Sequence, residues 1–508
     1  MCWVLKMKIE VDGRIVLSDI LDMPENEVRE FFREINNTVL KKGVPKGAIA
    51  PEINSFSVDG NEIKVNIISD RHVRAPNALL RIKKAIGKFL SKYKIGVRKV
   101  VIDRCYVEIE VDNSIDRLKL PYATCKIESN TVKFVVENIE EQKIEDGLID
   151  KLINLVKEKS LQSKYKGKTE FWKLEKKSNE KKMLFDENPT KKALELGWIS
   201  EFPSIGQWIF TPPITKIFRT IEKMIIENIA VKHGFQEAIY PKLIPLEIYA
   251  KTGHLKGSAH EMYFAEPPIK RDSEIFEEFY DYVRLGEIPK DMLREKLKPP
   301  LYGVCYAQCE PFYQLFSGKI VKLEDLPLKF FDRSGPSFRW ESGGVRGLER
   351  VNEFHRIEFT YIGAPQDVVE IRDALLKSAI EIVDKKLDLE WRVAQATPVY
   401  LAHEGRVSEE KGDFVHSYDL EVYLPFRGGR EESNWLEITS FHVHEDHYVR
   451  SFKIKEVKKR DIWTGCTGFG LERWLVGFLA EKGFEIEKWP EEIKNMVGEL
   501  PKPVNFVK

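Results

Sequence analysis

The chain has 508 residues, 81 basic and 81 acidic side chains and a hydrophobic content of 43%, a composition typical of globular proteins. This length predicts two or three domains, and the balanced charge by itself does not indicate a nucleic-acid partner. The six cysteines lack the regular spacing of a disulfide framework, and no apolar run approaches the ~20 residues that span a bilayer. Because the first residues also lack the pattern of a secretion signal, we expect a cytoplasmic protein with no membrane segment.

Residues 1–165 predict a domain in which helices pack on one side of an antiparallel sheet. Asp12-Gly13 and Asp59-Gly60 are typical of tight turns between strands. Helical spacing predicts two helices, at residues 25–42 and near residues 79–93. Strand-like alternation runs through residues 7–15, 56–68, 97–111 and 122–136.

Basic side chains concentrate at two places in and after this domain. A face of the second helix carries Arg81, Lys84, Lys88 and Lys92. Residues 166–196, which follow a third predicted helix, are rich in lysine and poor in branched aliphatic side chains, so we expect a linker. Such lysines are usually a solvated surface, but together with the basic helix face they could equally follow a phosphate backbone.

Residues 197–508 form the predicted second domain and contain four stretches suited to chemistry. Residues 272–297 are an insertion within it, with two short helices expected around a Gly-Glu-Ile-Pro turn. The first of the four stretches, residues 232–241, predicts a helix that ends at Gly234, followed by a strand whose Pro241 belongs at a sheet edge.

The second stretch, residues 338–358, begins with Phe-Arg-Trp-Glu and ends with an Arg-x-x-x-Phe-x-x-x-Glu pattern. This order suits two antiparallel strands that hold a nucleotide. Arg339 can pair with a phosphate through its planar fork, Glu341 can accept from an amine, and Phe354 offers a face for a purine. The four-residue spacing of the closing pattern is also compatible with the surface of an amphipathic helix.

The third and fourth stretches suit phosphate and metal binding. Residues 465–473 place three glycines before Arg473, and glycines let a helix N-terminus approach a phosphate closely. In residues 436–440, strand alternation predicts Glu437 and Thr439 on one face. A carboxylate there could hold a divalent ion that bridges phosphates.

Taken in chain order, these stretches resemble the three signature motifs of the class II aminoacyl-tRNA synthetases. The resemblance covers roughly the last three hundred residues and implies an antiparallel sheet flanked by helices, an α+β fold. It also implies a homodimer made through the first motif and a bent ATP. The implied catalytic residues are Arg339, Glu341 and Arg473. The implied ATP contacts come from Arg339, Glu341, Arg350, Val351, Phe354, Glu437 and Arg473.

Within this class, the chain resembles the seryl-tRNA synthetases. Residues 437–440 are similar to their Glu-x-x-Ser element, which implies that Glu437 and Ser440 hold magnesium, and Thr-Gly-His-Leu at residues 252–255 is also similar. The chain has an α+β domain where common members have a coiled-coil arm, as the zinc-dependent enzymes of methanogenic archaea do. Residues 441–444 read Phe-His-Val-His and depart from the common Cys-Ser-Asn. These alternating histidines suggest another metal or, more commonly, surface residues.

The methanogen-type resemblance implies one zinc per subunit, which takes the amino group of the substrate. Its implied ligands are Cys309, Glu358 and Cys466. Two thiolates and a carboxylate leave the fourth tetrahedral position free for substrate. Cys305 is the competitor, but its neighbours do not fit the motif. The implied serine contacts are Ala307, Arg339, Glu358, Trp391, Gln395 and Ser440.

The implied function is ATP-dependent activation of L-serine to seryl-adenylate and transfer of the seryl group to tRNA(Ser). The N-terminal domain would bind the tRNA, and residues 272–297 would order over the active site. Three alternatives stay open. One is a synthetase for threonine or another amino acid, although threonyl enzymes use Cys with two His. The others are a ligase that charges a carrier protein and a non-catalytic RNA-binding homologue.

Overall fold

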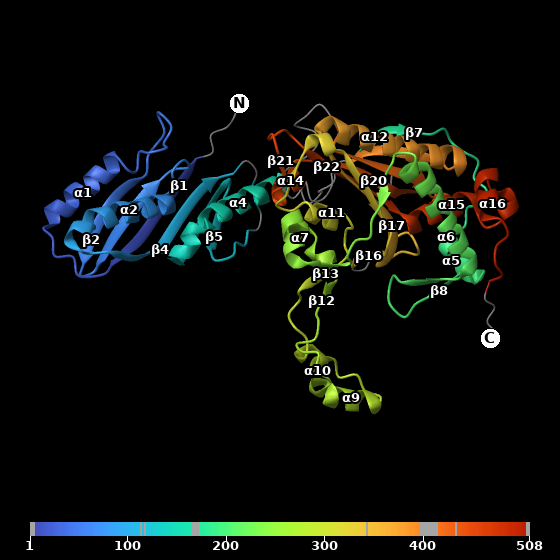
Figure 1. Ribbon diagram of the computed structural model, residues 1–508, viewed down its shortest axis with the longest axis horizontal. Coiled ribbons are helices and arrows are strands. Elements are labelled where there is room, and N and C mark those ends of the chain that lie inside the picture. The colour runs from blue at the N-terminus through green and yellow to red at the C-terminus, as the bar shows by residue number, and fades with distance from the viewer. Residues whose placement is uncertain are drawn as a thin grey trace. The chain divides into compact units, whose positions relative to one another are not determined.

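The computed structural model describes residues 6–111, 114–115, 118–164, 172–341, 344–396, 415–431 and 434–503. The chain divides into two compact units, Met1–Thr169 and Glu170–Lys508, and each has its own hydrophobic core (Figure 1). Among the described residues, every helix is too short or too polar to span a membrane.

The first unit is a six-stranded antiparallel sheet with helices packed against it. In spatial order its strands are β2 (Glu52–Asp59), β3 (Glu62–Ser69), β1 (Met7–Leu17), β4 (Val97–Glu110), β6 (Thr131–Glu140) and β5 (Thr124–Glu128). Its helices are α1 (Glu25–Asn37), α2 (Ala75–Leu90), α3 (Glu141–Glu145) and α4 (Leu148–Lys164). Leu79, Ile82 and Ile86 recur at helical spacing and bury one face of α2. The predicted α+β fold of this region is confirmed.

Of the two predicted turns in this unit, one is correct and one is wrong. Gly60 has a φ of +60° and joins β2 to β3, as the Asp-Gly pattern predicts. Asp12 and Gly13 instead lie inside β1, at a bulge in its pairing with β4. A Cβ added to Gly13 would lie 3.0 Å from the Leu79 side chain, so the glycine lets α2 approach the sheet closely.

The second unit is built on a nine-stranded sheet that is antiparallel except at one edge. In spatial order its strands are β10 (Gln236–Glu237), β15 (Leu328–Asp332), β17 (Glu353–Gly363), β22 (Trp463–Gly470), β20 (Trp435–Glu445), β19 (Ser417–Tyr423), β18 (Trp391–Ala396) and β7 (Trp172–Lys177), with β16 (Pro336–Phe338) paired to β17. The predicted edge strand of the first motif is β10, which follows Gly234 at a φ of +67°. The predicted antiparallel sheet of this region is confirmed.

Helices of the second unit bury the sheet in a large hydrophobic core (Figure 1). The helices in this core are α5 (Pro189–Glu195), α6 (Pro212–Ile225), α12 (Pro365–Glu381), α15 (Leu471–Lys482) and α16 (Glu491–Val497). Two smaller cores are lined by the shorter helices α7 (Leu246–Thr252), α8 (His254–Gly257), α11 (Glu310–Leu315) and α14 (His447–Ser451). Two two-stranded sheets complete the unit, the antiparallel pair β8 (Ile199–Glu201) with β9 (Trp208–Phe210) and the parallel pair β14 (Ile320–Val321) with β21 (Lys455–Glu456).

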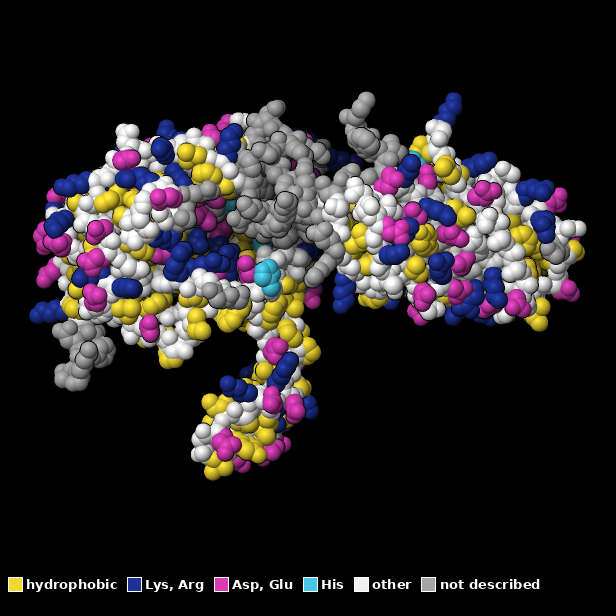
Figure 2. All heavy atoms as spheres, turned by 180° about the vertical axis from the view of Figure 1, so that it is seen from behind, with side chains coloured by type: hydrophobic (Ala, Val, Ile, Leu, Met, Phe, Trp, Pro, Cys, Tyr) yellow, Lys and Arg dark blue, Asp and Glu magenta, His cyan; other side chains and the backbone are white. Residues whose placement is uncertain are grey.

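The insertion of residues 272–297 projects from a small sheet of β11 (Leu243–Pro245), β13 (Tyr302–Val304) and β12 (Phe264–Ala265) (Figure 1). It holds the two short helices that its sequence predicts, α9 (Glu277–Arg284) and α10 (Lys290–Glu295). Its surface is partly apolar, as the yellow side chains of the lower lobe show in Figure 2. Leu285 and Ile288, in the turn between the helices, are 79% and 68% exposed.

The predicted linker at residues 166–196 is wrong as a separate segment. Residues 165–171 lie outside the described residues. Beyond them, β7 pairs with β18 in the large sheet, and α5 belongs to the core of the second unit. Lys181 forms ion pairs with Asp384 and Asp388, at 3.0 and 3.2 Å. These partners are distant in sequence, so local lysine content could not reveal that the segment is part of the second unit.

Candidate active site

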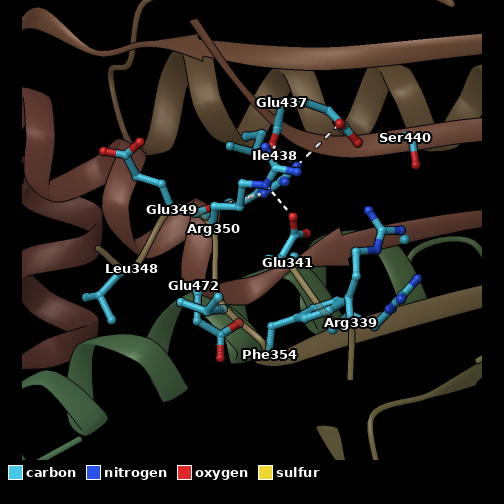
Figure 3. Close-up of a pocket in the computed structure, with 15 residues that line it drawn as sticks. Arg339, Glu341, Leu348, Glu349, Arg350, Phe354, Glu437, Ile438, Ser440 and Glu472 are labelled. Atoms are coloured by element: carbon cyan, nitrogen blue, oxygen red, sulfur yellow. Dashed lines mark hydrogen bonds and ion pairs between the residues drawn. The ribbon is translucent and has the colours of Figure 1, made fainter. Parts of the chain in front are cut away.

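A cavity in the second unit brings together residues of the second, third and fourth stretches (Figure 3). Arg339, Glu341 and Phe354 lie on one side, and Glu437 and Ser440 lie on the opposite strand. The lining residues are Arg339, Glu341, Leu348, Glu349, Arg350, Val351, Phe354, Arg356, Glu437, Ile438, Ser440, Gly468, Gly470, Glu472 and Arg473. All seven expected ATP contacts are therefore gathered around one cavity.

Ion pairs hold the arginines at the cavity walls. Arg350 pairs with the buried Glu341. Arg473 donates to the carbonyl oxygen of Glu437 at 3.0 Å and reaches its carboxylate at 3.3 Å. The Arg339 guanidinium lies 4.8 Å from the centre of the Tyr306 ring. Because each arginine is oriented by a neighbour yet partly exposed, a bound anion would meet charges that are already in place.

The second stretch forms strands, so the helix alternative is wrong. β16 pairs antiparallel with the start of β17, and Ser337 lies opposite Phe354. On β17, Phe354, Arg356 and Glu358 alternate and share one face. Arg356, which the sequence reasoning missed, donates to the Tyr306 carbonyl at 2.7 Å and lines the cavity. The period of two that continues from Phe354 to Glu358 was the signal that could have found it.

The third stretch is a strand that leads directly into a helix, as its glycines predict. β22 ends at Gly470 and α15 begins at Leu471, which puts Arg473 in the first helical turn. A Cβ added to Gly468 would lie 3.1 Å from a Glu358 carboxylate oxygen. Glycine at this position therefore leaves room for the carboxylate of the neighbouring strand.

Glu472, the second missed residue, fixes the strand beside this helix. Its carboxylate accepts from the His355 backbone N–H and contacts His355 Nδ1 at 2.8 Å. Burial alone would lower the pKa of His355, but the hydrogen bond and charge of Glu472 outweigh it and raise the pKa. This contact holds the Glu472 carboxylate against His355 at the wall of the cavity.

The fourth stretch departs from simple alternation. Thr439 is buried and its hydroxyl accepts from the Trp474 indole at 2.9 Å, whereas Glu437 and Ser440 line the cavity. The prediction that Glu437 and Thr439 share a face is therefore wrong. The pairing of β19 with β20 skips Ile438, and this irregularity changes which side chains face the cavity.

Three possible zinc ligands meet beside the cavity. The ligand atoms of Cys309, Glu358 and Cys466 all lie within 4.8 Å of one another, and all three residues are buried. Two thiols and a carboxylate at this separation fit tetrahedral zinc, whose ligands lie about 2.0–2.3 Å from the metal. Cys305, the competitor, instead contacts the Ala307 carbonyl at 3.3 Å and the Ser337 hydroxyl at 3.7 Å.

The electrostatics of this group also fit a cation. A hydrogen bond with Cys466 and burial raise the pKa of the Cys309 thiol well above its usual value. Burial raises the pKa of Glu358, although the charge of Arg356 opposes that shift. The three groups thus resist ionisation by themselves, and a divalent ion would compensate the charge of their deprotonated forms.

Some of the expected serine contacts lie elsewhere. Trp391 and Gln395 are absent from the described residues that line the cavity, whereas Ala307 packs against the core that contains Cys309 and Cys466. The Trp391 indole donates to Asp384 at 3.0 Å within the hydrophobic core, and Gln395 donates to Glu175 at 2.6 Å. Their assignment rested on position after the second motif, and the strand geometry of β18 turns them away.

His442 and His444 are not surface residues. His444 is 1% exposed, and its Nδ1 lies 3.2 Å from the Thr464 hydroxyl. Burial lowers the pKa of His442 to about 4 and holds that of His444 well below its usual value. Both rings are therefore neutral at pH 7. They also lie outside the cluster of possible zinc ligands found among the described residues.

Two family models match the chain. A tRNA-binding domain model matches residues 7–158, and a model of the tRNA synthetase class II core domain (G, H, P, S and T) matches residues 301–482. Curated relatives extend over the whole length. The type-2 serine–tRNA ligase of Methanocaldococcus jannaschii is 40% identical and is aligned over 98% of this chain and 98% of the relative. The chain belongs to the type-2 serine–tRNA ligase family.

Other type-2 serine–tRNA ligases agree with this assignment. The Methanococcoides burtonii enzyme is 35% identical over 99% of this chain and 100% of its own. The crystal structure of M. kandleri SerRS in complex with A. aeolicus tRNASec matches with a TM-score of 0.84, 36% identity and 99% coverage of each chain. A cytoplasmic serine–tRNA ligase from Naegleria fowleri, solved with AMP, matches at 15% identity with a TM-score of 0.50 over 66% of each chain, which shows the fold alone.

As a type-2 serine–tRNA ligase, the protein is a ligase of the class II synthetases, and the methanogen-type resemblance is confirmed. The threonyl alternative is thereby set aside. The carrier-protein ligase is set aside as well, because relatives named serine–tRNA ligase extend over the whole chain, including residues 7–158, which match a tRNA-binding domain.

Proposed function

We propose that this protein activates L-serine with ATP and transfers the seryl group to the terminal ribose hydroxyl of tRNA(Ser). The proposal rests on one arrangement, the group Cys309, Glu358 and Cys466 beside an arginine-lined cavity. In the first step, a serine carboxylate oxygen attacks the α-phosphorus of ATP and pyrophosphate leaves. In the second step, the ribose hydroxyl attacks the seryl carbonyl carbon and AMP leaves. We expect this reaction in the cytoplasm, where tRNA is charged for translation.

The residues around the cavity would do this mainly by placement and charge neutralisation. Arg339, Arg350 and Arg473 would meet the phosphates of ATP, and Phe354 would stack on the adenine. Glu437 and Ser440 present oxygen atoms, which are the ligands that magnesium prefers, so they would hold the ion that accompanies ATP. The serine carboxylate is already an ionised nucleophile and pyrophosphate is a good leaving group, so the attack needs little proton transfer from the protein.

Recognition of serine would depend on the zinc ligands. Cys309, Glu358 and Cys466 would hold one zinc per subunit with a fourth position open. When bound, zinc supplies a Lewis-acidic position for the amino group of serine. An apolar pocket distinguishes serine from alanine by only ~1–3 kcal/mol, whereas polar groups that are left unpaired by the wrong substrate discriminate far more strongly. This is the physical reason to recognise so small a substrate through its amine and hydroxyl groups.

The partners would be a second copy of the chain and tRNA(Ser). At the edge of the large sheet beside β10, Ile239 and Val231 are 82% and 70% exposed, which fits a homodimer through the first motif. In the first unit, Lys84, Lys88 and Lys92 of the α2 region are exposed and suit an RNA backbone. The insertion with α9 and α10 would order over the active site once the substrates are bound.

Amino-acid-dependent exchange of pyrophosphate into ATP tests the proposal directly. Each of the twenty amino acids is supplied alone to the zinc-loaded enzyme, with a mixture that lacks amino acid as the blank. We expect serine to stimulate exchange and threonine, glycine and alanine to stimulate it at least 10²-fold less. Stronger exchange with another amino acid would overturn the choice of substrate, and exchange with none would favour the non-catalytic RNA-binding alternative.

A further inference from the structure

We propose that His442 and His444 are positioning residues for two different functional groups, His442 for the Ser440 hydroxyl and His444 for the Cys466 thiolate. This inference rests on the proposed function, since it deepens the roles of Ser440 and Cys466. It assigns a purpose to the Phe-His-Val-His segment, which departs from the common seryl pattern and which the reaction itself does not use.

One strand face carries the whole arrangement. Ser440 and His442 alternate along β20 and therefore point to the same side. The pairing of β20 with β22 skips His444, whose ring nevertheless lies beside that of His442. The neighbouring β22 pairs Gly468 with Ser440 and Cys466 with His442. The histidines consequently lie in a row between the proposed magnesium ligand and the proposed zinc ligand, with ring centres 6.3 Å apart.

His444 contacts Cys466 through its outer ring nitrogen. Nε2 lies 3.5 Å from the Cys466 sulfur, within hydrogen-bond range for sulfur. The Thr464 and Tyr313 hydroxyls lie 3.2 and 3.3 Å from Nδ1 and can donate to it. This places the ring proton on Nε2, directed at the sulfur. An N–H donor of this kind stabilises a thiolate and fixes the direction of its lone pairs, which is how groups behind metal ligands raise affinity.

His442 accepts a hydrogen bond from Ser440, whereas His444 donates one to Cys466. The His442 Nε2 lies 3.0 Å from the Ser440 hydroxyl oxygen, and its Nδ1 contacts the buried Ser417 hydroxyl. The Ser417 hydroxyl lies 3.5 Å from the Phe441 carbonyl oxygen and can donate to it, so the ring proton sits on Nδ1. Nε2 then accepts a hydrogen bond from the Ser440 hydroxyl. The lone pairs of the Ser440 oxygen are thereby left to a cation.

Asn and Gln variants at each histidine distinguish the two proposed roles. Asparagine places its side-chain amide near the position of Nδ1 and falls short of Nε2, whereas glutamine reaches the position of Nε2. Asn and Gln variants at both positions therefore keep a polar side chain in the strand while only the Gln variants retain the outer contact. The full-length protein is used throughout, and thermal unfolding of each variant controls for folding.

Zinc affinity is measured by competition with a chelator, using the metal alone, and cobalt substitution reports the environment of the thiolates. We expect His444→Asn to weaken zinc binding about 10–100-fold and to shift the thiolate-to-cobalt absorption. We expect His444→Gln to recover most of the affinity. His442→Asn should bind zinc as the wild type does but need several-fold more Mg²⁺ for half-maximal pyrophosphate exchange, and His442→Gln should reverse this change.

Wild-type zinc affinity and an unshifted cobalt spectrum in His444→Asn would overturn the role of His444. An unchanged Mg²⁺ requirement in His442→Asn would overturn the role of His442. If both Asn variants showed the same loss of zinc affinity and the same rise in the Mg²⁺ requirement, the histidines would serve only to pack the strand, and the proposal would fail. Exchange by the wild type with an amino acid other than serine would instead count against the proposed function, because zinc competition requires no amino acid.

Discussion

Arg339 and Arg473 approach the cavity from different elements, the end of β16 and the first turn of α15. Both side chains are about one-third exposed, and neither belongs to the hydrophobic cores of the second unit. Their charges instead face the place where negative charge would develop on the phosphates. At this scale, function and stability are carried by different residues, and substitutions can separate the two.

Replacing Arg339 or Arg473 by alanine should lower serine-dependent pyrophosphate exchange by about 10²–10³-fold, the usual effect of losing one charge-assisted contact to a transition state. Thermal unfolding should stay close to that of the wild type. Arg450→Ala is the matched control, because this arginine is 59% exposed and pairs only with nearby Asp446 among the ion pairs of the described residues. Near-normal exchange in either pocket variant would count against the catalytic roles.

Cys309 and Cys305 offer a matched test of the zinc ligands. Both thiols are buried and lie four positions apart in the chain, but only Cys309 lies within 4.8 Å of Glu358 and Cys466 in the described cluster. Cys309→Ser should lose stoichiometric zinc and serine activation, because serine replaces a soft thiolate by a poor zinc ligand. Cys305→Ser should keep both. Metal analysis of the purified variants decides, and the reverse result would make Cys305 the ligand.

The elements show which features a sequence can predict and which it cannot. Local patterns were sufficient for α2, for the turn at Gly60 and for the strand-to-helix passage at Gly470, because periodicity and glycine chemistry act over a few residues. The face of Thr439 was mispredicted because a bulge in β20 depends on pairing with β19. The role of β7 was missed for the same reason, since its partner β18 lies more than 200 residues away.

The candidate site also has some residues that local sequence patterns predict and others that they do not. That the residues expected to contact ATP would lie together was predictable, because the motifs that carry them are short and ordered along the chain. The zinc group could be identified only through a family resemblance, since Cys309, Glu358 and Cys466 come from three distant segments. Trp391 and Gln395 were misplaced because sequence position after a motif does not fix the face of a strand.

The last turn of α15 contains a pH-sensitive contact. Burial raises the pKa of Glu481 from 4.5 to about 8, and both carboxylate oxygens accept from the Glu390 backbone N–H at 3.0 Å. A raised pKa in the folded state favours the neutral acid. Its contribution to stability is therefore complete below pH 4.5 and is lost as the pH rises through about 8.

The free energy of unfolding of the wild type should therefore fall by about 1 kcal/mol more between pH 7 and pH 9 than that of Glu481→Gln. Glutamine keeps the size of the side chain and one accepting oxygen but cannot ionise. Denaturant unfolding of the zinc-loaded proteins at both pH values gives the comparison. Glu485→Gln is the control, because that carboxylate is 68% exposed. Equal falls in wild type and Glu481→Gln would contradict the assigned pKa.

At the scale of the whole molecule, the two units carry separate tasks. The cavity and the proposed zinc ligands lie entirely within Glu170–Lys508, while the tRNA-binding domain model matches residues 7–158. Arg81, expected as part of the basic face of α2, donates to the Lys42 carbonyl at 2.6 Å and is half-buried. Lys84, Lys88 and Lys92 are exposed and are the better candidates for phosphate contacts.

Changing Lys84, Lys88 and Lys92 together to glutamine should weaken tRNA binding and lower the slope of log affinity against log salt by about 3, one for each lost phosphate contact. Adenylate formation should not change. A truncated chain that begins at Glu170, and so keeps β7, is the control, and it should form seryl-adenylate without charging tRNA. Normal tRNA charging by the truncated chain would contradict the division of tasks.

Zinc removal tests the central claim most directly, namely that Cys309, Glu358 and Cys466 hold a metal that selects serine beside an independent ATP site. Serine-dependent pyrophosphate exchange and equilibrium ATP binding are measured on the same preparation before chelation, after chelation and after zinc is restored. We predict that exchange is lost and then recovered, while ATP affinity changes less than about threefold, because the arginines and Glu437 do not depend on the metal. Full serine exchange by the zinc-free enzyme would contradict the account.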